Sequence, residues 1–192
     1  MNWETLLCLG DSITIGARSY LGYPEYAGNF LEAKSNKSWN VINHATSGFT
    51  ALNLLRDVGL NFDNLKSQCP SLITILIGTN DLKTNTSLED FKIAYNQLLI
   101  KARLIVGNRN IMLFEIPPLQ EGIMFPYRID MNDKIPEYNA IIRELGQQYG
   151  LMVHAFKAEA HQFLDGVHLN GQGSKEWGKQ LADIILQLRY RT

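Results

Sequence analysis

Ser12 is the residue of this chain whose surroundings most favour chemistry. It follows Gly10 and Asp11, directly after the apolar run 6–9, which is typical of a buried strand. In open α/β sheets, ligands bind at the carboxyl ends of the strands. A serine hydroxyl placed there is a candidate nucleophile if a base, a group that orients the base and donors for an oxyanion lie close to it.

Three other segments offer these partners. His168 is the candidate general base, and Asp165 can orient it, because a spacing of three lets both side chains turn toward one cavity from a single loop. In such a triad the base takes the serine proton during attack and returns it to the leaving group. The segments 47–48 and 78–81 also lie at predicted strand ends or in loops.

The composition indicates a soluble globular protein and gives no sign of a nucleic-acid partner, because the formal net charge is -1 and no basic run occurs. The length of 192 residues fits one domain, 1–192. We predict that Cys8 and Cys69 are reduced, largely buried thiols, and the sequence offers no convincing set of metal ligands. Oligomeric state is left open.

The N-terminus lacks the basic and apolar regions of a signal peptide, and no stretch approaches the roughly 20 apolar residues of a membrane-spanning helix. We therefore expect a cytoplasmic protein without a membrane span. The mature form of a secreted protein would have the same sequence features.

Apolar runs that alternate with helical patterns predict a parallel sheet with right-handed crossovers. The run 72–77 is nearly all apolar, as is typical of a strand covered on both faces. The expected fold is a three-layer α/β/α sandwich with a parallel, flavodoxin-like sheet of about five strands. The predicted strands are 6–9, 40–44, 72–77, 111–116 and 151–154. The predicted helices are 25–33, 51–58, 88–105, 138–149 and a C-terminal helix that includes 177–188.

Local patterns also mark some boundaries and one irregular segment. Ser87 and Asp90 predict the start of the helix 88–105, and Gly107 with Asn108 predicts its end. The segment 117–131 is apolar and contains two consecutive prolines, so it is either a substrate lip at the carboxyl edge of the sheet or a loop folded onto the core.

Four blocks of the chain, in order, resemble those of the GDSL esterases, also called SGNH hydrolases. The resemblance runs from Gly10 to Asn170, and it implies the same α/β/α fold. It also implies that Ser12 is the nucleophile, His168 the base and Asp165 the orienting group. The blocks are Gly10-Asp11-Ser12, Ser47-Gly48, Gly78-Thr79-Asn80-Asp81 and Asp165-Gly166-Val167-His168.

The same resemblance implies an oxyanion hole made by the N–H groups of Ser12 and Gly48 and by the side-chain amide of Asn80. It implies no cofactor and no metal. The second block departs from the family pattern, because Ala45 stands where many members have a glycine. The substrates of such proteins include acetylated sugars, lysophospholipids, thioesters and aryl esters, so we expect a small-molecule, carbohydrate or lipid ester.

Two other functions remain as alternatives. The same site could pass the acyl group to a sugar or another alcohol rather than to water. A flavodoxin-like module that binds a phosphorylated ligand is disfavoured, because the segment 10–16 has neither a Walker lysine nor a Gly-x-Gly-x-x-Gly pattern.

Several residues also have a structural interpretation. Ser12 and Asn80 could be turn or capping residues, and we expect structural roles for Asp11 and Asp81. Packing or surface roles are expected for the three other histidines, His44, His154 and His161. A tyrosine cluster after the nucleophile could line a pocket or pack under the first helix, and it comprises Tyr20, Tyr23 and Tyr26.

Overall fold

The computed structural model describes residues 3–107, 110–123 and 125–189. Its centre is a five-stranded sheet with the order β2-β1-β3-β4-β5, in which all the paired strands are parallel. This is the flavodoxin-like order that the sequence predicts. The strands are β1 (Trp3–Gly10), β2 (Ser38–Ala45), β3 (Leu72–Leu76), β4 (Ile111–Phe114) and β5 (Met152–His154).

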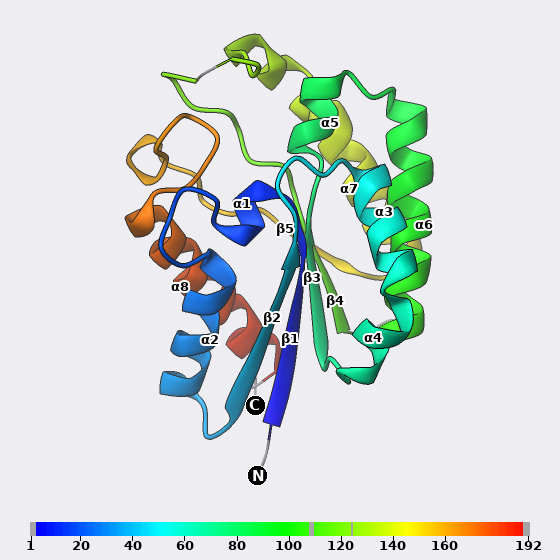
Figure 1. Ribbon diagram of the computed structural model, residues 1–192, viewed down its shortest axis with the longest axis vertical. Coiled ribbons are helices and arrows are strands. Elements are labelled where there is room, and N and C mark those ends of the chain that lie inside the picture. Colours follow the sequence, from blue (N-terminus) through cyan, green and yellow to red (C-terminus); the bar gives the residue numbers. More distant parts are fainter. Residues whose placement is uncertain (1–2, 108–109, 124, 190–192) are drawn as a thin grey trace.

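Helices cover both faces of the sheet and give three layers (Figure 1). One face carries α2 (Tyr23–Lys34) and α8 (Gly171–Arg189), which pack against each other. The other face carries α3 (Ala51–Leu60), α4 (Phe62–Ser67), α6 (Leu88–Val106) and α7 (Ile135–Tyr149). The expected α/β/α sandwich is therefore confirmed.

The central strands form because every side chain of β3 and β4 is buried between the two helical layers. The helix α6 begins where the sequence predicts, since the Ser87 hydroxyl accepts a hydrogen bond from the Asp90 N–H at 3.1 Å. It ends at Gly107, as predicted, whereas Asn108 lies outside the described residues.

Two short helices at the carboxyl edge of the sheet were not predicted. Ser12 begins α1 (Ser12–Ile15), and Asn80 lies in α5 (Thr79–Thr84), although both residues were expected in loops or turns. Segments of four and six residues are too short to show a helical period. Later in the chain there are two 3₁₀ turns, η2 (Ile129–Asp133) and η3 (Ala160–Gln162).

The prediction for one cysteine was wrong. Cys8 is buried in β1, but Cys69 is exposed; both are free thiols. Cys69 adopts a left-handed backbone conformation (φ 49°) after α4, where Pro70 prevents the helix from continuing. Its side chain lies in a turn and not in the core.

None of the helices in the described part of the chain is both long enough and apolar enough to cross a membrane. The start of β1 and the end of α8 lie toward the end of the sheet opposite α1 and α5 (Figure 1). The carboxyl ends of the strands, where the predicted site residues follow, are thus gathered at one end of the molecule.

Candidate active site

The predicted nucleophile is held at the edge of the sheet by a helix cap. Asp11 caps α1, because its Oδ1 accepts a hydrogen bond from the Ile13 N–H at 3.0 Å. This is the structural role predicted for Asp11. Gly10 lets Thr14 and β3 pack closely against the end of β1, since a Cβ at this position would lie 2.2 Å from Thr14 Oγ1 and 2.6 Å from the Leu76 carbonyl oxygen.

Ser12, His168 and Asp165 form a hydrogen-bonded chain. The His168 Nε2 lies 2.9 Å from Ser12 Oγ, and its Nδ1 lies 2.8 Å from Asp165 Oδ2. The second carboxylate oxygen of Asp165 accepts the backbone N–H groups of Val167 at 3.1 Å and His168 at 2.8 Å. The structure therefore brings together three residues that lie up to 156 positions apart in the chain.

The charge state of Asp165 suits its position. Burial alone would raise the pKa of this carboxyl, but hydrogen bonds from the backbone and ring of His168, the charge of His168 and the Val167 N–H hold the pKa below its ordinary value. The carboxylate is thus ionised near neutral pH, and the ring Nδ1–H of His168 can donate to it.

Gly48 lies close to the nucleophile in a turn that the Phe49 N–H closes by donating to the Thr46 carbonyl at 3.3 Å. Its φ of 82° belongs to the left-handed region that favours glycine. Within the described residues its N–H has no hydrogen-bond acceptor. Ala45, which departs from the family pattern, is the last residue of β2. Despite this departure, Gly48 lines the cavity.

The amide of Asn80 is held on both sides. Its Nδ2 donates to the Phe49 carbonyl oxygen at 3.0 Å and makes a longer contact of 3.4 Å with Asp11 Oδ2. Its Oδ1 accepts the Tyr127 hydroxyl at 2.8 Å. These contacts fix the orientation of the amide, because Nδ2 and Oδ1 cannot exchange places without losing them.

A cavity of about 270 Å³ joins these groups. It is lined by Ser12, Ala17, Arg18, Ser47, Gly48, Asn80, Lys83, Tyr127 and His168. Three of them, Arg18, Lys83 and Tyr127, carry functional groups that sequence patterns did not identify. Lys83 is one helical turn after Asn80, but only the fold shows that both side chains reach the same cavity.

The segment 117–131 folds partly onto the core and partly along the cavity. Tyr127 lines the cavity and Ile123 packs against the core, whereas Phe125 is exposed. Met124 lies outside the described residues. The Gln120 N–H also donates to the Gly166 carbonyl at 2.8 Å, which ties this segment to the loop that carries Asp165 and His168.

The other predicted residues lie elsewhere. Tyr20 is exposed, and buried Tyr23 bonds Thr14 Oγ1 at 3.1 Å. His44 pairs with an aspartate, Asp57, at 2.6 Å. The remaining residues of these two groups, Tyr26, His154 and His161, also do not line the cavity.

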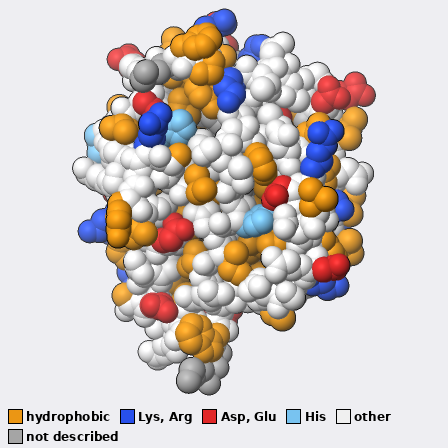
Figure 2. Space-filling model, viewed as in Figure 1, with side chains coloured by type: hydrophobic (Ala, Val, Ile, Leu, Met, Phe, Trp, Pro, Cys, Tyr) orange, Lys and Arg blue, Asp and Glu red, His pale blue; other side chains and the backbone are white. Residues whose placement is uncertain are grey.

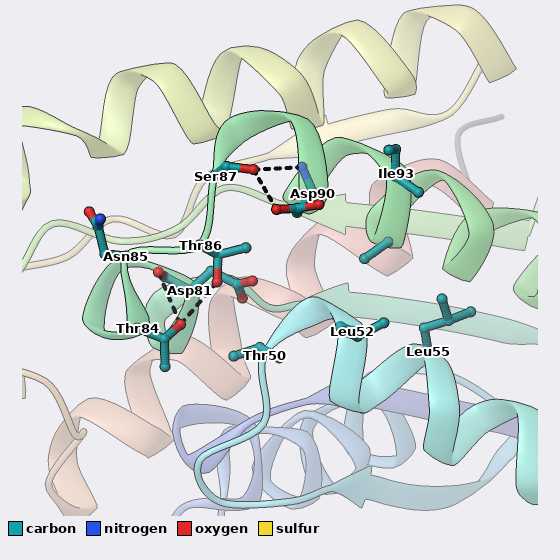
Figure 3. Close-up of a pocket in the computed structure, with 11 residues that line it drawn as sticks. Thr50, Leu52, Leu55, Asp81, Thr84, Asn85, Thr86, Ser87, Asp90 and Ile93 are labelled. Atoms are coloured by element: carbon teal, nitrogen blue, oxygen red, sulfur yellow. Dashed lines mark hydrogen bonds between the residues drawn. The ribbon is translucent and has the colours of Figure 1, made fainter.

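A larger cavity of about 720 Å³ lies between α3, α5 and the start of α6 (Figure 3). Leu52 and Leu55 of α3 face Asp90 and Ile93 of α6 across it. Asp81 also lines it and has the expected structural role, because its Oδ2 accepts the Ala51 N–H at 2.9 Å and so holds the start of α3. The Ser87 hydroxyl donates to the Asp90 carboxylate at 2.6 Å in this cavity and also caps α6, but no histidine is among the described residues that line the cavity. We therefore place the candidate active site at the smaller cavity, where a serine and a histidine are paired.

In the residues that the structure describes, no cluster of three or more His, Cys, Asp or Glu side chains is arranged to hold a metal ion. The arrangement of Ser12, His168 and Asp165 can instead supply a nucleophile, a proton acceptor and a group that orients it.

Comparison with known proteins identifies a family and several solved structures of similar fold. The model of the GDSL-like lipase/acylhydrolase family matches residues 8–176. A multidomain esterase from Ruminococcus flavefaciens is 27% identical in an alignment of 219 positions that includes 94% of this chain. The chain spans only 28% of the length of that relative.

The fold is similar to those of several solved structures. The acetylxylan esterase Axe2 from Geobacillus stearothermophilus has a TM-score of 0.70 at 22% identity, with 98% of this chain and 95% of that chain covered. A lipase/acylhydrolase from Enterococcus faecalis has a TM-score of 0.76 at 20% identity, with 95% of each chain covered. Structures of Axe2 include catalytic mutants in which a serine, an aspartate or a histidine is replaced by alanine.

Asp11 should make stability depend on pH. Burial raises the pKa of this carboxyl from 3.8 to about 7, although the Ile13 N–H lowers it, and the nearby Asp81 charge adds to the rise while the Lys83 charge opposes it. Because the folded state binds the proton more tightly, this stabilising contribution is complete below about pH 4 and is lost as the pH rises through about 7.

Asp11→Asn keeps an oxygen for the cap but removes the buried charge. We expect the variant to have a higher free energy of unfolding than the wild type at alkaline pH, and a smaller loss of stability between mildly acidic and alkaline pH, measured by urea titration. Asp63→Asn, at an exposed aspartate of α4, is the matched control and should follow the wild type. Parallel pH profiles for wild type and Asp11→Asn would contradict the assignment.

Proposed function

Because the chain belongs to the GDSL-like lipase/acylhydrolase family, we propose that it hydrolyses carboxylic esters through an acyl-enzyme on Ser12. The observation that carries the proposal is the hydrogen-bonded chain from Asp165 through His168 to Ser12. Support also comes from Axe2, a protein of similar fold whose catalytic mutants change the same three residue types.

In the first half of the proposed reaction, His168 Nε2 takes the proton of Ser12 as Oγ attacks the carbonyl carbon of the ester. The same proton then passes to the alcohol oxygen, the bond between carbonyl carbon and alcohol oxygen breaks, and the acyl group remains on Oγ. In the second half, His168 takes a proton from water as the water oxygen attacks the acyl carbon. The bond between that carbon and Ser12 Oγ then breaks, His168 returns the proton to Oγ, and the acid is released. Asp165 stabilises the imidazolium that forms in each half.

The oxyanion of each tetrahedral intermediate would be stabilised by the N–H groups of Ser12 and Gly48 and by Asn80 Nδ2. One hydrogen of Nδ2 already bonds the Phe49 carbonyl. The other makes only the long contact of 3.4 Å with Asp11, so it is the hydrogen that would be offered to the oxyanion. Each such donor typically contributes about 10²–10³ in turnover.

The proposed substrate has a short acyl group, such as acetyl. The cavity beside Ser12 is small, at about 270 Å³, and Tyr127 forms part of its wall. This proposal agrees with the fold similarity to Axe2, which is an acetylxylan esterase. Acetylated carbohydrates are therefore the first natural esters to assay.

The triad is tested by labelling and by turnover. A fluorophosphonate should label Ser12, and Ser12→Ala should not be labelled. Ser12→Ala and His168→Ala should lose at least about 10⁴-fold in kcat for 4-nitrophenyl acetate, and Asp165→Ala should lose less, because the triad acts as a unit. Ser67→Ala, at an exposed serine of α4, is the control that should keep both labelling and turnover.

Turnover by folded Ser12→Ala at the wild-type rate would refute the proposed function. Product analysis with glycerol present separates hydrolysis from acyl transfer, because transfer would yield acetylglycerol in place of acetate.

The acyl-chain preference is a separate prediction. We expect kcat/KM for 4-nitrophenyl octanoate to be about 10-fold or more below that for the acetate, because the small cavity cannot enclose the longer chain. Steady-state rates across a series of chain lengths provide the measurement. An octanoate rate equal to the acetate rate would show that acyl chains are bound outside this cavity.

Tyr127 should act through Asn80 as a positioning residue. Burial raises the pKa of its hydroxyl above the ordinary value, so the hydroxyl remains a donor to Asn80 Oδ1 over the working pH range. Tyr127→Phe removes that single hydrogen bond, and we expect kcat for 4-nitrophenyl acetate to fall about 2- to 10-fold with KM little changed.

The control is Tyr20→Phe, which changes a tyrosine that is 96% exposed and should leave both constants unchanged. If Tyr127→Phe raises KM and leaves kcat intact, the hydroxyl contacts the substrate and does not orient Asn80.

A further inference from the structure

The cavity beside Ser12 is lined by two cationic side chains, Arg18 and Lys83, and by no carboxylate of the described residues. The Arg18 Nε lies 3.6 Å from Asp165 Oδ2, at the edge of the proposed triad, and the side chain is 58% exposed. In Figure 2, blue cationic side chains lie on either side of a pale-blue histidine in the upper part of the molecule, where the carboxyl ends of the strands are found. An anionic group at this cavity would therefore meet favourable charge.

Lys83 is not neutralised by a neighbour. Its Nζ lies 5.5 Å from the centre of the Tyr127 ring, and it forms no ion pair with any carboxylate in 3–107, 110–123 or 125–189. The aromatic ring holds the ammonium group without cancelling its charge. Lys83 is thus available to a substrate.

Lys83 also lines a second cavity, of about 220 Å³, next to the first. Arg128 and Asp130 of this cavity neutralise each other through two hydrogen bonds of 2.9 and 2.6 Å. Lys134 donates to Asn85 Oδ1 at 2.6 Å and has no carboxylate partner among the described residues. The remaining lining residues are Leu82 and Met131.

The second cavity therefore keeps two positive charges, from Lys83 and Lys134, after its one carboxylate is paired. The N-terminus of α7, which begins after Lys134, adds nothing to this charge, because its first turn already contains Glu137 and a proline. The two lysines do not depend on the proposed triad, and they indicate a site for a negatively charged group.

We propose that the second cavity is an anionic subsite, and that the substrate is an ester whose alcohol part carries a carboxylate or a phosphate. The inference rests on the proposed function, since it places the acyl group at Ser12. The alcohol part must leave the small cavity, and Lys83 is shared by both cavities, so a path past Lys83 leads to Lys134.

The test compares esters that differ only in charge. One pair is the methyl glycosides of 3-O-acetylglucuronic acid and 3-O-acetylglucose, and the other is 1-O-acetylglycerol 3-phosphate and 1-O-acetylglycerol. We expect kcat/KM to be about 10-fold higher for a charged ester than for its neutral partner at low salt, and the difference to shrink at high salt. The two pairs show whether a carboxylate or a phosphate is preferred.

Variants locate the preference. Lys83→Gln and Lys134→Gln should each lower the ratio of charged to neutral kcat/KM toward one. Lys179→Gln, at an exposed lysine of α8 outside both cavities, should leave the ratio and the rates unchanged. A wild-type ratio near one for both pairs, with 4-nitrophenyl acetate still hydrolysed through Ser12, overturns the subsite and leaves the proposed function intact.

Binding gives a test that does not require turnover. Calorimetry on Ser12→Ala should show tighter binding of methyl glucuronoside than of methyl glucoside, or of glycerol 3-phosphate than of glycerol, and adding Lys134→Gln should remove the difference. This result supports the subsite even if no ester is hydrolysed. Equal affinities for the charged and neutral ligands in both pairs overturn it.

Discussion

The contact between Ser12 Oγ and His168 Nε2, at 2.9 Å, is the constraint on which the rest of the site depends. Its two residues come from opposite ends of the chain and from segments that follow different strands. Ser12 follows β1 near the middle of the sheet, whereas His168 follows β5 at the edge. The segment after β5 must therefore cross the carboxyl end of the sheet before α8 begins.

Aromatic packing determines that path. Phe156, just after β5, stacks at 4.4 Å on both Phe114 and Trp177, and so joins β4 to α8. Phe163 packs edge-on against Trp177, and the bridge between Phe163 and Leu169 closes the loop that carries the histidine. The core thus positions the imidazole, because the loop ends are anchored in the same aromatic cluster that joins the sheet to α8.

Charges of opposite sign lie near the proposed oxyanion hole: the carboxyls of Asp11 and Asp81 and the ammonium group of Lys83. The buried carboxyls of Asp11 and Asp81 lie behind the proposed oxyanion hole, where negative charge would oppose an oxyanion. Burial raises both pKa values, and the positive charge of Lys83 acts on Asp11. Asn80 stands between Asp11 and the cavity, so its amide dipole separates the buried carboxyl from the reacting oxygen. Lys83, which lines both cavities, would then place positive charge beside the proposed oxyanion hole and in the proposed anionic subsite.

The sequence allowed the centre of the sheet to be predicted because β3 and β4 are buried on both faces and form continuous apolar runs. It also allowed Ser12, Asp165 and His168 to be chosen, since each belongs to a short block whose order along the chain is informative; their catalytic roles remain a proposal. Tyr127 could not be chosen in this way. Its contact with Asn80 joins positions 47 residues apart and depends on how an irregular segment folds back over the sheet.

That segment explains how the site can vary in specificity while its chemistry is retained. The stretch 117–131 touches the loop that carries Asp165 and His168 through Gln120 and the proposed oxyanion hole through Tyr127, and it supplies Arg128 and Asp130 to the second cavity. It belongs to no strand of the sheet, so exposed positions in it can change without altering the strand order. Changes at its cavity-lining residues would act on the alcohol part of a substrate first. They would reach the reacting atoms through the Tyr127 hydroxyl and through the packing of Gln120 and Ile123 against Gly166.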